Sequence, residues 1–210
     1  MDLHIRNQTT LYFIRHGQTR YNIQHIRQGV QIDDYLDTKG IIQTEKIIPI
    51  IEKLNLDIIY TSYLHRADES VAIIKSKSKN PISIYHDFRL RERDFGSLTG
   101  KPQEYWDQIL PNNKELETMQ IYDYRPFGGE SVENVRQRTF SCLLDIVTNH
   151  THKNIGIFTH NGIIRLLLFH FPDIPRIYRS EDTDKDIANC DIYEWEITEG
   201  RIANIKSLLK

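Results

Sequence analysis

An arginine–histidine–glycine triplet follows an apolar run near the start of the chain. The stretch LYFIRHGQTRYN covers Leu11 to Asn22, and its four apolar residues, Leu11–Ile14, predict a buried strand that ends directly in Arg15 and His16. A neutral imidazole is a good nucleophile towards phosphorus when one ring nitrogen faces the substrate and the other is held as a donor. Gly17 lets the backbone come close, so a peptide carbonyl beside it could hold His16 in this way.

Two further predicted strands end in groups that could share this chemistry. Thr159-His160 follow the strand NIGIF, and Arg66 lies one helical turn beyond the strand DIIY. Ligands of an open α/β sheet bind outside the carboxyl ends of the strands, so these groups should meet Arg15 and His16 at one rim. Phosphoryl transfer needs positive charge around the phosphoryl oxygens, which Arg15, Arg66 and a protonated His160 could supply.

The oxygen of the leaving group also needs a proton donor. Glu92 lies in the loop RLRERDFGSLTG, between two arginines and just before a glycine turn. A carboxyl in such a loop can act as a general acid, so Glu92 is the candidate for this task.

Strands alternate with helices along the chain. We expect strands at 11–14, 57–60, 81–85, 154–158, 189–197 and 202–208, and helices at 38–54, 64–74, 132–146 and 162–169, with a short helix after Gly17. Pro49 should kink or divide the helix that contains it. The alternation predicts an α/β fold with helices on both faces of a sheet. Residues 100–129 are aromatic and irregular, and we expect them to form a short lid.

The composition of the chain is that of an ordinary globular protein and does not indicate a macromolecular partner. The chain has 210 residues, a length that suits a single domain over residues 1–210, and its net charge of -2 favours neither nucleic acid nor an anionic membrane. Its start is polar, no apolar run reaches the roughly 18 residues of a spanning helix, and Cys142 and Cys190 do not form a disulfide framework. We expect a cytoplasmic protein. His150 and His152 lack a neighbouring carboxylate or thiolate, so we expect no metal site.

Six motifs, in order along the chain, resemble those of the histidine phosphatase superfamily, which includes cofactor-dependent phosphoglycerate mutase and fructose-2,6-bisphosphatase. They are FIRHGQTRYN, GVQIDDYLDTKG, TSYLHRADES, LRERDFGSLTG, PFGGES and FTHNGIIR. The resemblance covers about Leu11 to Ile197. It implies a three-layer αβα sandwich around a mostly parallel sheet.

The resemblance also implies a role for each matched residue. His16 would form a phosphohistidine, and Glu92 would protonate the leaving group and then activate water. Arg15, Arg66 and His160 would hold the phosphoryl oxygens. The candidates for further substrate contacts are Asn22, Gly17, Thr19 and Asn161. The hydrolytic reaction of the family needs no metal and no diffusible cofactor.

Three departures from the family pattern carry expectations of their own. Asp37 stands where threonine is common, and we expect a change of helix cap without catalytic effect. Phe95 replaces the tyrosine of the mutase pattern, which weakens the mutase interpretation. Glu69 and Ser70 replace a threonine–alanine pair and should matter little on a helix surface.

Three functions compete. The favoured one is a phosphomonoesterase, a histidine acid-type phosphatase that hydrolyses a phosphorylated small molecule. The alternatives are a phosphoglycerate mutase and a catalytically inactive phospho-ligand binding module. Glu130 follows Glu92 by only 38 positions, which is short for a cover that excludes water as a mutase requires. An inactive module should have lost at least one of the five catalytic candidates, and all five are present.

The substrate itself is left open by the sequence. We expect a small phosphorylated molecule, although sugar phosphates, phosphoglycerates, nucleotides and phosphopeptides all stay open, and we allow for a homodimer. Arg125 and Lys101 are candidates to bind a second anionic group of the substrate. Tyr105, Trp106 or Tyr124 could stack on a ring.

Overall fold

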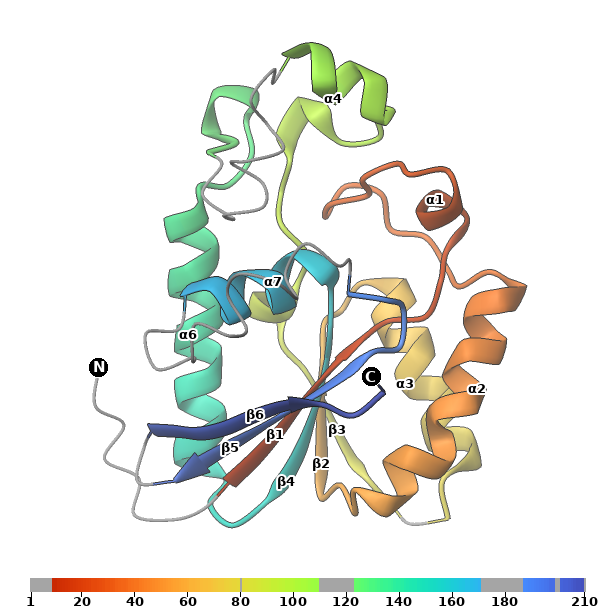
Figure 1. Cartoon of the computed structure of the whole chain (residues 1–210), viewed down its shortest axis with the longest axis vertical. Helices are drawn as coiled ribbons and strands as arrows, with labels where there is room; N and C mark the ends of the chain where they lie inside the picture. Colours follow the sequence, from red (N-terminus) through yellow and green to blue (C-terminus); the bar gives the residue numbers. More distant parts are fainter. Residues whose placement is uncertain (1–8, 80, 110–122, 171–186, 199–200, 210) are drawn as a thin grey trace.

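The computed structural model describes residues 9–79, 81–109, 123–170, 187–198 and 201–209. Six strands form one sheet in the order β3-β2-β4-β1-β5-β6 (Figure 1). β1, β2, β3 and β4 run parallel, β5 is antiparallel to β1, and β6 is antiparallel to β5. The strands are β1 (Thr9–Arg15), β2 (Ile58–Thr61), β3 (Ser83–His86), β4 (Asn154–Thr159), β5 (Ile192–Thr198) and β6 (Arg201–Ser207). The mostly parallel sheet predicted from the sequence is confirmed.

Helices cover both faces of the sheet (Figure 1). One face packs against α2 (Thr38–Lys53) and α3 (His65–Lys77), and the other against α6 (Val132–Asn149) and α7 (Asn161–His170). The alternation of side chains along β1 explains both cores. Leu11 and Phe13 belong to the core under α6 and α7, whereas Tyr12 and Ile14 belong to the core under α2 and α3. The result is the expected three-layer sandwich.

Short elements lie in the connections. They are α1 (Arg20–Ile23), η1 (Phe88–Leu90), η2 (Gly96–Leu98), α4 (Gln103–Ile109) and η3 (Arg125–Phe127). The expected lid at 100–129 is therefore described at its two ends by α4 and η3, while 110–122 lie outside the described residues. No helix in the described part of the chain is both long and apolar enough to cross a bilayer.

Pro49 does not divide its helix, so of the two expected outcomes, a kink or a division, the division is excluded. α2 continues from Thr38 to Lys53 with Pro49 inside it. Pro49 is on the exposed side of the helix, so the carbonyl of Glu45 that loses its helical partner lies on the side that faces water. The missing hydrogen bond is therefore tolerated.

The loop after β1 packs directly on the first turn of α2. A Cβ atom on Gly17 would lie 2.6 Å from the carbonyl oxygen of Gly40, and one on Gly40 would lie 2.1 Å from the carbonyl oxygen of Gln18. Asp37 begins the helix by accepting a hydrogen bond from the Gly40 backbone at 2.7 Å, which confirms the expected cap. Two glycines thus allow backbone to touch backbone beside His16.

We predict that Gly40→Ala lowers the free energy of unfolding by about 1–3 kcal/mol, because the new methyl group overlaps a backbone carbonyl that cannot move alone. The displacement of Gln18 should also reduce activity. Urea unfolding measures the first effect. Lys39→Ala, at the exposed neighbouring position, is the matched control. Equal stability of the two variants would contradict the close approach.

Candidate active site

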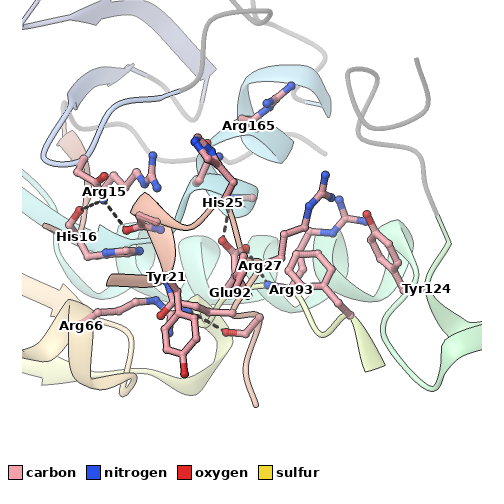
Figure 2. Close-up of a pocket in the computed structure, with 18 residues that line it drawn as sticks. Arg15, His16, Tyr21, His25, Arg27, Arg66, Glu92, Arg93, Tyr124 and Arg165 are labelled. Atoms are coloured by element: carbon pink, nitrogen blue, oxygen red, sulfur yellow. Dashed lines mark hydrogen bonds between the residues drawn. The ribbon is translucent and has the colours of Figure 1, made fainter. Parts of the chain in front are cut away.

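His16 is held in one tautomer at the carboxyl end of β1. Its Nδ1 atom lies 2.7 Å from the carbonyl oxygen of Gly17, and only 3% of the residue is exposed. A carbonyl can only accept a hydrogen bond, so Nδ1 carries the proton and Nε2 keeps its lone pair. The residue lines a cavity of about 460 Å³ (Figure 2). The sequence-based expectation of a backbone carbonyl beside Gly17 matches this geometry.

The surroundings of His16 keep its ring neutral. Burial lowers the pKa of His16 well below 6.5, and the charges of Arg66 and Arg15 lower it further. The hydrogen bond to Gly17 acts in the opposite direction and is the smaller effect. At neutral pH the ring is therefore an uncharged imidazole with an available nitrogen.

Arg66 is the most firmly held cation of the site. It is 1% exposed, and its two terminal nitrogens donate to the carbonyls of Ile32 (3.1 Å) and Gly29 (2.8 Å). Burial lowers the pKa of Arg66 to about 10, so it keeps its charge at neutral pH. Arg15 also lines the cavity, and its guanidinium donates to the carbonyl of Ile187. Backbone carbonyls thus help to fix both guanidinium groups.

Ser70 connects Arg66 with the loop of His16. Its hydroxyl accepts the N–H of Gly17 at 3.1 Å and donates to the carbonyl of Arg66 at 2.8 Å. Ser70 is fully buried, and Glu69 accepts the backbone N–H of Leu36 at 2.7 Å. The expectation that Glu69 and Ser70 matter little on a helix surface is wrong, because this part of α3 faces the site.

His160 lies against His16 but differs from the sequence expectation in charge. The ring centroids are 5.2 Å apart, and His160 is 0% exposed. Neither of its ring nitrogens has a hydrogen-bond partner among the described residues. Burial, followed by the charge of Arg66, lowers the pKa of His160 well below 6.5. The ring is neutral rather than protonated, and it can give a phosphoryl oxygen one N–H.

Glu92 is fixed on the cavity wall by two backbone groups. Its carboxylate accepts the N–H of Arg93 at 2.8 Å and the N–H of Gly162 at 3.1 Å. A Cβ atom on Gly162 would lie 2.3 Å from the carboxylate, so a side chain at this position would displace the carboxylate of Glu92. The family-like segment FTHNGIIR therefore supports the acid as well as His160.

Arg138 holds the backbone that carries Glu92. This side chain reaches from α6 and donates to the carbonyls of Arg91 (2.9 Å) and Glu92 (3.1 Å). Both oxygens of Glu130 accept from Arg138 at 2.9 Å. Burial alone would raise the pKa of Glu130, but Arg138 and Arg91 outweigh it and lower the pKa. An ionised pair thus fixes the acid loop to α6.

Asn22 and Asn189 form hydrogen bonds with the segment that follows β1 and carries His16. Asn189 donates to the carbonyl of His16 at 3.0 Å and to the side-chain oxygen of Asn22 at 3.2 Å. The same oxygen accepts the N–H of Thr19 at 3.0 Å, so the amide nitrogen of Asn22 can donate to a ligand. Thr19 caps α1 and accepts from Gln28 at 2.8 Å. Thr19 therefore positions Asn22 and is not itself part of the cavity lining.

The structure brings some of the other sequence candidates to the cavity and leaves others outside. Asn161 and Tyr124 line it, and Gly17 contributes through its carbonyl. Arg125 does not: it is exposed on η3 and forms an ion pair with Asp123 at 2.7 Å. The remaining candidates outside the lining are Lys101, Tyr105 and Trp106. Arg125 and Lys101, which the sequence suggested for a second anionic group, therefore lie outside the cavity lining.

Several residues that line the cavity were not predicted from the sequence. They include Tyr21, His25, Arg27, Arg93, Arg165 and Asn189. Arg93 follows Glu92 directly, and Arg165 is the last residue of the segment FTHNGIIR, so the sequence positions of these two could have indicated the site. In the described residues, no group of three or more histidines, cysteines or carboxylates is arranged to hold a metal ion.

Comparison with known proteins places the chain in the same family that the sequence motifs indicated. Residues 11–207 match the model described as histidine phosphatase superfamily (branch 1). The chain is 33% identical over 130 residues to fructose-2,6-bisphosphatase TIGAR of Xenopus tropicalis, covering 61% of this chain and 46% of that protein. It therefore spans about half the length of that relative.

Two further relatives cover most of both chains. The 2,3-bisphosphoglycerate-dependent phosphoglycerate mutase of Cytophaga hutchinsonii is 27% identical over 184 residues, 87% of this chain and 82% of that one. The solved structure of Bacillus stearothermophilus YhfR has a TM-score of 0.79 at 30% identity and covers 93% of this chain and 95% of its own. The fold and the family are therefore shown independently of the site geometry.

The neutral histidines predict a pH-dependent stability. His16 and His160 have lowered pKa values when folded and ordinary ones when unfolded, so the unfolded chain binds more protons below pH 6.5. The free energy of unfolding should then fall as pH decreases from 6.5, by about 1.4 kcal/mol per pH unit for each ring. Urea unfolding between about pH 7 and 5.5 measures this slope. His160→Asn should make it shallower, and an unchanged slope would contradict the neutral ring.

Arg138 should act through Glu92. We predict that Arg138→Gln slows esters with poor leaving groups by about 10- to 100-fold more than p-nitrophenyl phosphate, whose leaving group needs little protonation. Glu92→Gln should give the same pattern with a larger effect. Arg136→Gln, on the exposed side of the same helix, is the control. A uniform loss on all esters would show that Arg138 supports only the fold.

Proposed function

Because the chain belongs to the histidine phosphatase superfamily, we propose that it is a phosphomonoesterase that hydrolyses a small phosphorylated molecule through a phosphohistidine at His16. One observation carries the proposal. The Gly17 carbonyl holds the Nδ1 proton, so the neutral His16 ring offers Nε2 to a phosphorus atom between Arg15 and Arg66.

The first half of the reaction transfers the phosphoryl group. Nε2 of His16 forms a bond to phosphorus while the bond from phosphorus to the ester oxygen breaks. Protonated Glu92 gives its proton to that oxygen, which leaves as an alcohol. Arg15, Arg66, the amide of Asn22 and an N–H of His160 donate to the phosphoryl oxygens as charge develops on them.

The second half returns the enzyme to its starting state. Glu92, now a carboxylate, takes a proton from water, and the water oxygen bonds to phosphorus as the bond to Nε2 breaks. Inorganic phosphate leaves, and Glu92 is again protonated. The proton that Glu92 lost in the first half is thereby restored.

A phosphoglycerate mutase would use the same residues, and the C. hutchinsonii relative carries that name. Two observations favour hydrolysis. Phe95 lines the cavity where the mutase pattern has a tyrosine, and the interval from Glu92 to Glu130 is short for a cover that excludes water. The third candidate, an inactive binding module, is disfavoured because all five catalytic candidates are present together: Arg15, His16, Arg66 and Glu92 line one cavity, and His160 packs against His16.

Some properties stay predictions from the sequence. We propose a single domain over residues 1–210, a cytoplasmic location and a homodimer. Size-exclusion chromatography with light scattering tests the homodimer.

The proposal predicts a labile phosphoenzyme that depends on His16. A ³²P-labelled ester should label the wild type with an acid-labile, base-stable phosphoryl group, and His16→Ala should abolish both label and turnover. Steady release of phosphate should greatly exceed formation of 2-phosphoglycerate from 3-phosphoglycerate and 2,3-bisphosphoglycerate.

Circular dichroism checks that His16→Ala keeps its fold. Normal phosphatase activity in a folded His16→Ala protein would end the proposal. Mutase flux well above hydrolysis would instead reverse the ranking of the two enzymes while keeping the phosphohistidine.

A further inference from the structure

The turn that holds Arg66 also lies against the acid loop, residues 92–100. Arg66 donates to the carbonyls of Gly29 at 2.8 Å and Ile32 at 3.1 Å. A Cβ atom on Gly29 would lie 3.0 Å from a ring carbon of Phe95, so the backbone of the turn approaches the acid loop closely. The carbonyls that orient the phosphate-binding cation are therefore part of a segment that packs on the loop of the general acid.

Gln31 joins the turn to the acid loop through both ends of its amide. Its Nε2 atom donates to the carboxylate of Asp94, and its Oε1 atom accepts from the hydroxyl of Thr99 at 2.6 Å. An ionised carboxylate can only accept hydrogen bonds, so this contact settles the orientation of the amide. A backbone bond runs beside it, from the N–H of Gly100 to the carbonyl of Arg27 at 3.0 Å. Three hydrogen bonds thus connect the two segments.

The acid loop is the better anchored of the two segments. Asp94 donates its N–H to the carboxylate of Glu130 at 3.1 Å and accepts the N–H of Glu130 at 2.9 Å. Glu130 in turn forms an ion pair with Arg138 of α6. Gln31, by contrast, is exposed at the surface. Loss of the Gln31 bonds should therefore move the turn and its two carbonyls, while the acid stays in place.

We infer that Gln31 is a positioning residue for phosphoryl transfer, because it holds the carbonyls of Gly29 and Ile32 against the acid loop and so fixes the direction in which Arg66 presents its guanidinium. Gln31 is not among the residues that line the cavity, so it acts through Arg66 and not by touching the substrate. The inference rests on the proposed function, which assigns Arg66 to the phosphoryl oxygens. A guanidinium that is held in place loses little side-chain freedom when phosphate binds.

Gln31→Met tests the role, because it removes both side-chain bonds and keeps the length of the side chain. We expect kcat/KM and the affinity for inorganic phosphate each to fall about 5- to 30-fold, as expected for the loss of one neutral and one charged hydrogen bond. The loss of kcat/KM should be the same for p-nitrophenyl phosphate and propyl phosphate, unlike that of Arg138→Gln. Gln24→Met, at an exposed position outside the cavity lining, is the control and should stay within about twofold of the wild type.

A double-mutant cycle assigns the loss to Arg66. Arg66→Lys keeps the positive charge but removes the planar fork that spans the carbonyls of Gly29 and Ile32. The exact position of these carbonyls then no longer directs the cation. In the Arg66→Lys background, Gln31→Met should therefore lower kcat/KM by less than about twofold. A residue that only supported the fold would cost the same in both backgrounds.

Two results would overturn the positioning role of Gln31. One is an unchanged kcat/KM and an unchanged phosphate affinity in Gln31→Met. The other is an equal loss of kcat/KM from Gln31→Met in the wild-type and Arg66→Lys backgrounds. Calorimetric titration with inorganic phosphate separates this inference from the proposed function, because it needs no turnover. If no ester were hydrolysed, weaker phosphate binding by Gln31→Met would still support the role, and equal binding would count against it.

Discussion

The hydrogen bond from Nδ1 of His16 to the carbonyl of Gly17 is the contact on which the rest of the site depends. This hydrogen bond determines which ring nitrogen faces the cavity. The carbonyl can hold the ring in this orientation only if the peptide group itself is held in a fixed position. The N–H of Gly17 binds Ser70, and the residue lies against Gly40 and Thr44 with no room for a side chain. The tautomer of one histidine is thus determined by the packing of β1, α2 and α3.

The electrostatics of the site follow from burying cations and imidazoles together. Arg66 is bound by carbonyl groups, which stabilise its charge without cancelling it. The charge of Arg66 disfavours protonation of the two buried histidines. Burial acts in the same direction, because it destabilises the charged form of each ring, and both effects lower the pKa values. A site with neutral rings and charged guanidiniums is matched to a phosphate dianion. A phosphate dianion would stabilise the guanidinium charges that burial disfavours.

Most of the fold and the catalytic set could be predicted from the sequence, because both depend on local patterns. Buried strands that end in Arg15 and His160, and a glutamate before a glycine turn, are visible in short stretches. Contacts between distant segments were not. Ser70 faces Gly17 across 53 positions, and Asn189 meets His16 across 173. The charge of Arg125 made it a candidate to bind an anionic group of the substrate. Its ion pair with Asp123 and its exposure depend on where η3 lies, which the sequence does not show. The charge state of His160 follows from complete burial, which a motif does not reveal.

The nucleophile and the acid are held by opposite layers of the sandwich. His16 and Arg66 depend on α2 and α3, whereas Glu92 depends on Gly162 of α7 and Arg138 of α6. β1 and β4 pair directly and join the two halves, so the distance between nucleophile and acid is set by the most buried strands of the sheet.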